Sequence, residues 1–219
     1  MTTHEPAPVE RRAARRWPWV SGGVGILLVL ALGALVALRT SPLELDAEWM
    51  DEIVEHRGPV WEIPSQLMNF LGGGWFSVFA VPLGLGILLV MLRKPWSALF
   101  LVLTLAVSAG LVQVLKSLFG RARPEQILVT ADFGSFPSGH TANAATLAVV
   151  FGLLAWRWWV WAIGALYVVL MALSRTYLGA HWVTDTVAGA LLGAAVAILV
   201  WAPFAVKLRS EWSRPDPDR

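Results

Sequence analysis

The residues best suited to chemistry in this sequence are two histidines and an aspartate. His181 and Asp185 are four positions apart in a segment with helical patterning, so their side chains share one helical face. A carboxylate within reach of an imidazole fixes its tautomer and leaves the other ring nitrogen free to act as a nucleophile. His140 lies in another predicted helix and can act as a general acid, because histidine has an ordinary pKa of about 6.5.

Three basic residues indicate what these groups would act on. Lys116, Arg123 and Arg175 lie at or near the ends of apolar segments, where ionisable side chains are costly and usually functional. Their like charges would repel one another unless an anion lay among them. Planar guanidinium groups bind phosphate through paired hydrogen bonds, and a lysine adds a point charge. The set therefore predicts a binding site for a tetrahedral oxyanion.

The chain just before His140 adds further anion ligands. Ser138 and Gly139 precede a predicted helix, so their backbone N–H groups and the serine hydroxyl can point at the same anion. Glycine at this position lets the backbone approach the ligand closely. With phosphate as the anion, His181 would attack phosphorus and His140 would protonate the leaving oxygen.

Neither a metal nor a cofactor is expected. The sequence has no cysteine, which excludes thiolate ligands and thiol nucleophiles. A zinc ion held by the two histidines and Asp185 would lie beside three positive side chains, whose field attracts an anion instead. The acidic residues Glu125 and Asp132, in the loop near the site, are expected to be solvated. Arg121 is an additional basic residue without an assigned role.

Three stretches of the chain resemble a known signature. They are Lys116-x6-Arg123-Pro124, Pro137-Ser138-Gly139-His140 and Ser174-Arg175-x5-His181-x3-Asp185. Together they resemble the type-two phosphatidic acid phosphatases, a superfamily that also includes bacterial acid phosphatases and vanadium haloperoxidases. The resemblance implies a phosphohistidine intermediate on His181, protonation of the leaving group by His140, and no metal. It also implies that phosphate is held by Lys116, Arg123, Ser138, Gly139 and Arg175.

The composition is that of a membrane protein. The 219 residues are 57% hydrophobic and 15% charged, whereas about a quarter of the residues of soluble proteins are charged. A helix needs about 20 mainly apolar residues to cross a bilayer. We therefore expect one all-α domain with six transmembrane helices, at Trp17–Leu38, Trp75–Leu92, Trp96–Leu115, His140–Trp156, Trp158–Leu173 and Trp182–Ala205.

The distribution of positive charge predicts the orientation of these helices. The side of the membrane that holds both chain termini carries most of the 17 Lys and Arg residues. Such an excess marks the cytoplasmic side. We therefore expect a multi-pass protein of the plasma membrane, with both termini in the cytoplasm and the three signature stretches on the extracytoplasmic side. The basicity follows topology, so no nucleic acid partner is expected.

The segments outside the six helices are predicted as follows. Leu45, Trp49 and Ile53 recur at helical spacing among acidic residues, which favours a short extracytoplasmic amphipathic helix over Glu44–Glu55 on the membrane surface. The alternative is a solvated acidic loop that packs on the bundle. Gly72–Gly74 is expected to be a flexible break. The domain is expected to cover residues 17–207, between a disordered basic cytoplasmic tail at 1–16 and a cytoplasmic tail at 208–219.

These features lead to one functional hypothesis and three alternatives. We expect a lipid phosphate or lipid diphosphate phosphatase whose partners are the bilayer and a substrate such as polyprenyl diphosphate, phosphatidate or phosphatidylglycerophosphate. The alternatives are a lipid phosphotransferase, a vanadate-dependent peroxidase and a membrane protein without enzymatic activity. The sequence leaves the choice of lipid and the oligomeric state open.

Overall fold

The computed structural model describes residues 8–213, and the regular structure within them is helical. The helices are α1 (Pro8–Ala37), α2 (Glu44–Glu55), α3 (Pro59–Gly72), the π-helix η1 (Phe76–Ala80), α4 (Val81–Met91), α5 (Pro95–Phe119), α6 (Gly139–Ala155), α7 (Trp158–Tyr177) and α8 (Val183–Trp212). The all-α prediction is confirmed for this part of the chain.

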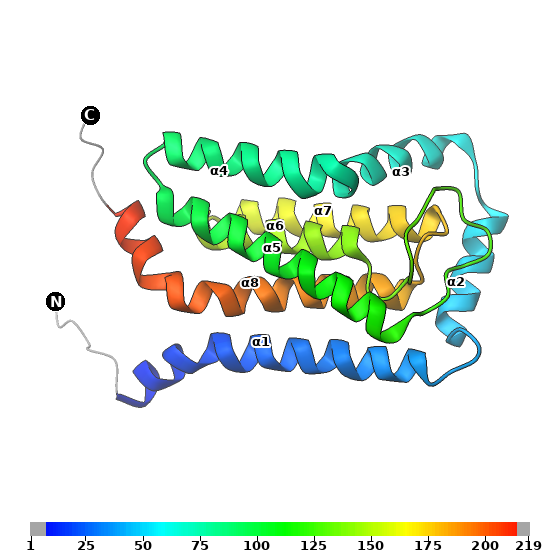
Figure 1. Ribbon diagram of the computed structural model, residues 1–219, viewed down its shortest axis with the longest axis horizontal. Helices are drawn as coiled ribbons and strands as arrows, with labels where there is room; N and C mark the ends of the chain where they lie inside the picture. Colours follow the sequence, from blue (N-terminus) through cyan, green and yellow to red (C-terminus); the bar gives the residue numbers. More distant parts are fainter. Residues whose placement is uncertain (1–7, 214–219) are drawn as a thin grey trace.

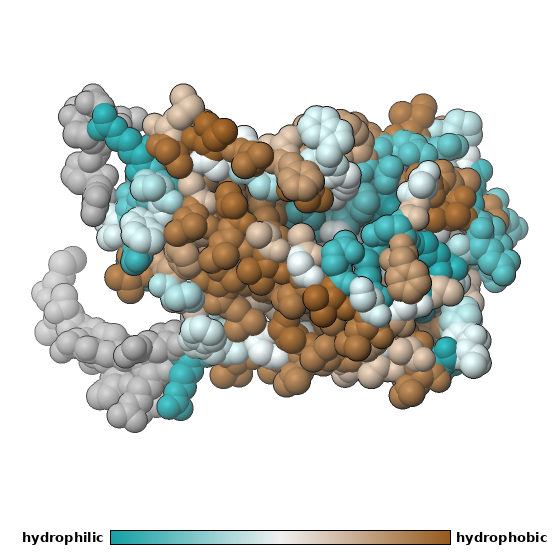
Figure 2. Space-filling view, viewed as in Figure 1, coloured by the Kyte–Doolittle hydropathy of each residue, from teal (hydrophilic) through white to brown (hydrophobic). Residues whose placement is uncertain are grey.

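The long helices run side by side along the longest axis of the molecule (Figure 1). The start of α1 and the end of α8 lie at one end of the bundle. At the other end, α2 crosses the helix ends, and the loop at residues 120–138 folds over them. Figure 2 shows hydrophobic residues over the sides of the long helices and hydrophilic residues gathered at the end that carries α2.

By length and composition, four helices could cross a membrane: α1 from Arg16, α5, α7 and α8. A fifth span results if α3 and the η1–α4 helix, bent by 46° against each other, count as one. The remaining apolar helix, α6, has 17 residues, somewhat less than the usual length of a spanning helix. A multi-span membrane protein is thus confirmed, and six spans remain a prediction.

The region before the second predicted span differs from expectation. The sequence predicted no helix between residue 56 and Trp75, but α3 fills most of this stretch. Gly72–Gly74 does mark a break, because α3 ends there and the chain bends before η1. The prediction missed α3 because Pro64 lies inside it and proline ordinarily ends a helix.

The helices extend further than predicted at both ends of the chain. Helix α1 begins at Pro8, inside the segment predicted to be disordered, whereas residues 1–7 and 214–219 lie outside the described residues. Helix α8 continues to Trp212, past the predicted domain end at residue 207. Its buried Glu211 accepts hydrogen bonds from the backbone N–H groups of Trp96 (2.7 Å) and Ser97 (3.0 Å). This contact caps the first turn of α5, so the region is part of the fold.

Close packing of α6 against α8 fixes the end of the bundle that carries the signature. Side chains at Gly189 and Gly193 would collide with the backbone carbonyls of Ser138 and Ala142, so both positions need glycine. The helices are therefore close enough for the Ser138 N–H to donate to the Asp185 carbonyl at 2.9 Å. This hydrogen bond fixes the start of α6 against the first turn of α8.

Candidate active site

A cavity of about 600 Å³ lies where the signature residues meet. Its polar wall comes from the start of α6, the ends of α5 and α7, the 120–138 loop, and His181 in the turn between α7 and α8. Its apolar wall comes from η1, α4 and the middle of α5. The predicted site residues that line the cavity are Lys116, Arg123, Gly139, His140, Arg175 and His181. One space thus combines a charged wall with an apolar one.

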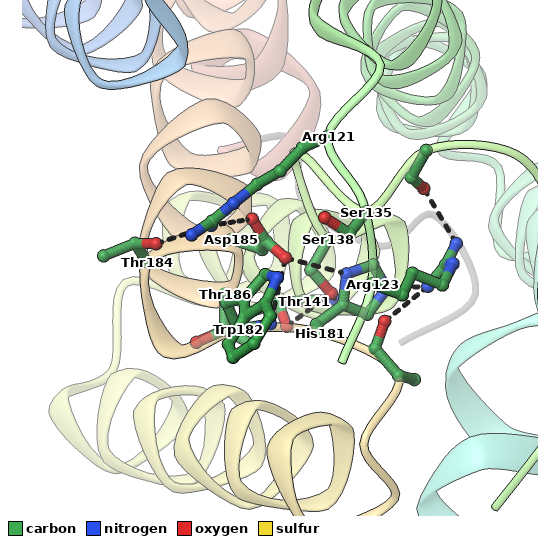
Figure 3. Close-up of polar contacts among 12 residues, drawn as sticks. Arg121, Arg123, Ser135, Ser138, Thr141, His181, Trp182, Thr184, Asp185 and Thr186 are labelled. Carbon is green, nitrogen blue, oxygen red and sulfur yellow. Dashed lines mark hydrogen bonds and ion pairs between the residues drawn. The ribbon is translucent and has the colours of Figure 1, made fainter. Parts of the chain in front are cut away.

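The histidine and carboxylate predicted to act together are neighbours (Figure 3). The Asp185 Oδ2 atom lies 3.6 Å from His181 Nδ1, and both side chains are buried. Oδ2 also accepts from the backbone N–H of Trp182 at 2.9 Å, which ties the carboxylate to the first turn of α8. The other imidazole nitrogen, Nε2, lies 3.5 Å from an Nη atom of Arg123. The nitrogen available for attack therefore faces a phosphate-binding candidate.

Burial lowers the pKa of His181 to about 4, an effect that the positive charges of Arg175 and Arg123 reinforce and the Asp185 carboxylate opposes. The imidazole is therefore neutral at physiological pH. A neutral imidazole keeps the lone pair that nucleophilic attack requires.

Two of the predicted phosphate ligands share a carboxylate. The Asp132 Oδ1 atom lies 3.0 Å from Lys116 Nζ and 2.7 Å from an Nη atom of Arg123. Burial tends to raise the pKa of Asp132, but its hydrogen bond to Lys116 and the charges of Lys116 and Arg123 lower it overall. The sequence predicted a solvated Asp132. The side chain is indeed 58% exposed, yet it bridges the two cations that were assigned to the anion.

The third cation and the second histidine are held by a residue that the sequence did not single out. Asn69, in α3, accepts a hydrogen bond from Arg175 through its side-chain oxygen. Its backbone oxygen lies 3.2 Å from His140 Nε2. Gly73 also packs on this ring, because a side chain there would overlap the imidazole. Asn69 was missed because α3 was not predicted and a lone asparagine carries no sequence signal.

Ser138 lies behind the cavity wall. Its side chain is fully buried, its hydroxyl caps α6 through Thr141, and its N–H is donated to Asp185. This N–H is therefore engaged by a backbone carbonyl in this structure, whereas Gly139 lines the cavity. Among the described residues, the one cluster of possible metal ligands is Glu52, Glu55 and His56, which are all exposed on and beside α2.

Comparison with known proteins gives a consistent set of matches. The family model described as the PAP2 superfamily matches residues 97–208. Phosphatidylglycerophosphatase B of Bacillus subtilis is 36% identical over 118 residues, which are 49% of this chain and 58% of that protein. An undecaprenyl-diphosphatase of Sulfolobus acidocaldarius is 32% identical over 133 residues, 57% of this chain and 61% of that one. The chain thus matches about three-fifths of the length of these relatives.

Two crystal structures share the fold. The PAP2-type phosphatidylglycerolphosphate phosphatase of Bacillus subtilis superposes with a TM-score of 0.76 at 29% identity, over 85% of this chain and 96% of that one. LpxE of Aquifex aeolicus superposes with a TM-score of 0.65 at 29% identity, over 74% of this chain and 98% of that one. The similarity therefore extends well beyond the signature stretches.

Proposed function

Because the chain belongs to the PAP2 superfamily, we propose that it is a membrane phosphatase that hydrolyses a lipid phosphate or lipid diphosphate. One observation carries the proposal. A buried histidine, with a carboxylate 3.6 Å from its Nδ1 atom, faces a cavity whose wall holds the cations Lys116, Arg123 and Arg175. A cavity of this kind can bind one phosphoryl group beside a nucleophile.

Hydrolysis proceeds in two displacements. His181 Nε2 attacks phosphorus, the bond from phosphorus to the leaving oxygen breaks, and His140 gives its proton to that oxygen. Water then attacks phosphorus as His140 takes up one of its protons, the bond from His181 Nε2 to phosphorus breaks, and inorganic phosphate leaves with both histidines restored. The Asp185 carboxylate stabilises the positive charge that develops on the ring, and the three cations stabilise charge on the phosphoryl oxygens. No step needs a metal ion.

The substrate is a phosphate on an apolar tail. The apolar wall of the cavity includes Phe79 and Leu83 on one side and Val102 and Leu105 on the other, next to the charged wall. This arrangement suits an alcohol or phosphate leaving group attached to an acyl or prenyl chain. Relatives named as phosphatidylglycerophosphatase, undecaprenyl-diphosphatase and lipid A 1-phosphatase support lipid phosphates as a class.

The cavity is proposed to open on the extracytoplasmic face of the plasma membrane. The start of α1 and the end of α8 lie at the end of the bundle opposite α2 (Figure 1). That end also carries Arg93, Lys94 and Arg157, in the short connections that follow α4 and α6. The positive-inside rule assigns it to the cytoplasm. Phosphate would then enter from the outer headgroup region while the tail stays in lipid.

The test is phosphate release by the purified protein from phosphatidate, phosphatidylglycerophosphate and undecaprenyl diphosphate, with and without a chelator. We expect release that the chelator leaves unchanged and that His181→Ala abolishes. The matched control is His56→Ala, a change to an exposed histidine on the helix-bundle surface, which should retain activity. Appreciable turnover by His181→Ala would refute the assigned nucleophile. Phosphate transfer to an added lipid or sugar acceptor would instead favour a phosphotransferase.

A further inference from the structure

Arg121 belongs to no signature position, yet it lies in the most enclosed ionic network of the described chain. One of its Nη atoms donates to Asp185 Oδ1 at 2.6 Å and to the Thr184 hydroxyl at 2.8 Å. The other donates to Asp46 Oδ2 at 2.7 Å. Both carboxylates are fully buried, and the Arg121 side chain is only 8% exposed. A buried ionic group of this kind is costly unless every member is paired.

The network joins three separate elements. Asp46 comes from α2, Arg121 from the loop after α5, and Thr184 and Asp185 from the first turn of α8. Asp46 also accepts from the backbone N–H of Thr184 at 2.9 Å and from its hydroxyl at 2.6 Å. Helix α2 is thereby attached to the turn that carries the carboxylate partner of His181. Arg121 is not among the described residues that line the cavity, so it has no direct access to phosphate.

We propose that Arg121 and Asp46 are positioning residues that hold the Asp185 carboxylate in the orientation His181 requires, with α2 as the fixed support. The expected effect on kcat rests on the proposed function, whereas the expected effect on the titration of His181 does not. It assigns a role to Arg121 and to α2, neither of which touches the substrate.

The division of oxygen atoms on Asp185 explains how the network would act. Arg121 holds Oδ1, while Oδ2 accepts from the Trp182 N–H and faces His181 Nδ1. With Oδ1 held, rotation of the carboxylate would break a charged hydrogen bond. Asp46 matters for a second reason, because its negative charge balances Arg121 and keeps the guanidinium from cancelling the negative charge that Asp185 presents to the imidazole.

The charges around His181 allow a test in which two substitutions are expected to shift its titration in opposite directions. The His181 imidazole faces Asp185 from α8, Arg175 from α7, Arg123 from the 120–138 loop and His140 from α6. Removing the positive charge of Arg121 should make the imidazole easier to protonate, whereas removing the negative charge of Asp46 should make it harder. A purely structural role would disturb both variants in the same direction.

The first experiment is kinetic and compares Arg121→Met, Arg121→Lys and Asp46→Asn with the wild type. We expect kcat to fall by about tenfold to a hundredfold in each, the range for a catalytic group displaced by up to 1 Å. KM should change little, because the phosphate ligands are untouched. The matched control is Asp51→Asn, which removes the same charge from an exposed position of α2 and should behave as wild type.

The second experiment follows the ring nitrogens of His181 by NMR in ¹⁵N-histidine-labelled protein, which contains four histidines. The titration of His181 should move to higher pH in Arg121→Met and to lower pH in Asp46→Asn. Arg121→Lys keeps the charge but cannot reach Thr184, Asp185 and Asp46 together, so it should lower kcat without moving the titration.

Three results would overturn the proposal: a shift of the same sign in both charge-removing variants, wild-type kcat in Arg121→Lys, or an increase in KM alone. If Arg121→Met or Asp46→Asn does not fold, Arg121→Lys still decides, because it preserves the buried charge balance. The titration needs no substrate. A wild-type protein that releases no phosphate from any lipid would therefore refute the proposed function while leaving the coupling of Arg121 to His181 testable.

Discussion

Replacing Asp185 by asparagine tests the mechanism at its electrostatic centre. The change keeps the size of the side chain and removes one negative charge 3.6 Å from His181 Nδ1. At an effective dielectric constant of about 20, a full positive charge on the ring would lose about 4.6 kcal/mol of stabilisation. If only half of that charge develops in the transition state, the loss is about 2.3 kcal/mol. We therefore expect kcat to fall between about 50-fold and about 2,000-fold, since about 1.36 kcal/mol corresponds to a factor of ten.

The assay is release of inorganic phosphate from a lipid phosphate in detergent micelles, together with rapid-quench detection of the phosphohistidine. Formation of the intermediate should slow by the same factor as kcat, whereas KM should stay near the wild-type value because Lys116, Arg123 and Arg175 remain. The variant must elute as the wild type does in size-exclusion chromatography. A folded Asp185→Asn enzyme within fivefold of wild-type kcat would show that the carboxylate does not stabilise charge on His181.

Three further predictions concern the rest of the site. Asp132→Asn should lower KM by up to about fivefold, the scale of a partly exposed ion pair of ~0.2–1 kcal/mol, because Lys116 and Arg123 lose a competing anion; an increased KM would contradict this. Asn69→Ala should lower kcat/KM by about ten- to a hundredfold, as expected for losing one charged hydrogen bond of ~1.5–3 kcal/mol to Arg175. Asn69→Asp should lower kcat/KM less than Asn69→Ala does. The lowered pKa of His181 keeps its neutral form dominant down to about pH 4, so the second-order rate of phosphorylation at subsaturating lipid, which reports on the free enzyme, should fall through loss of the nucleophile only below that pH; a histidine titration near pH 6.5 would disagree.

Much of this site could be predicted because its residues occupy helix ends. Six of the eight predicted residues line one cavity, although up to 65 positions separate Lys116 from His181. Long apolar helices connect them, and helices that cross a bilayer return their ends to one of two surfaces. Topology alone therefore brings distant polar residues together. The identity and spacing of those residues then indicate the chemistry.

The unpredicted parts depend on contacts that no pattern encodes. Asn69 acts through its place on α3, a helix hidden in the sequence by an internal proline. The buried position of Asp46 was not expected either, because α2 was interpreted from its apolar residues Leu45, Trp49 and Ile53. In the structure Leu45 is 59% exposed, whereas Asp46 and Met50 are buried. The helix was predicted correctly, and two of these apolar residues, Trp49 and Ile53, are half-buried on the same side as Asp46, which pairs with Arg121.

The inward position of Asp46 on α2 follows from the cost of burying a guanidinium. Arg121 lies beneath α2 and against α8, where water cannot solvate it, so each of its donors needs an acceptor from the protein. Asp185 supplies one negative charge, which is also needed by His181. A second carboxylate therefore has to come from another element, and Asp46 is the residue of α2 that reaches it. The pairing of Arg121 with both carboxylates thus accounts for a buried aspartate on the inward face of α2.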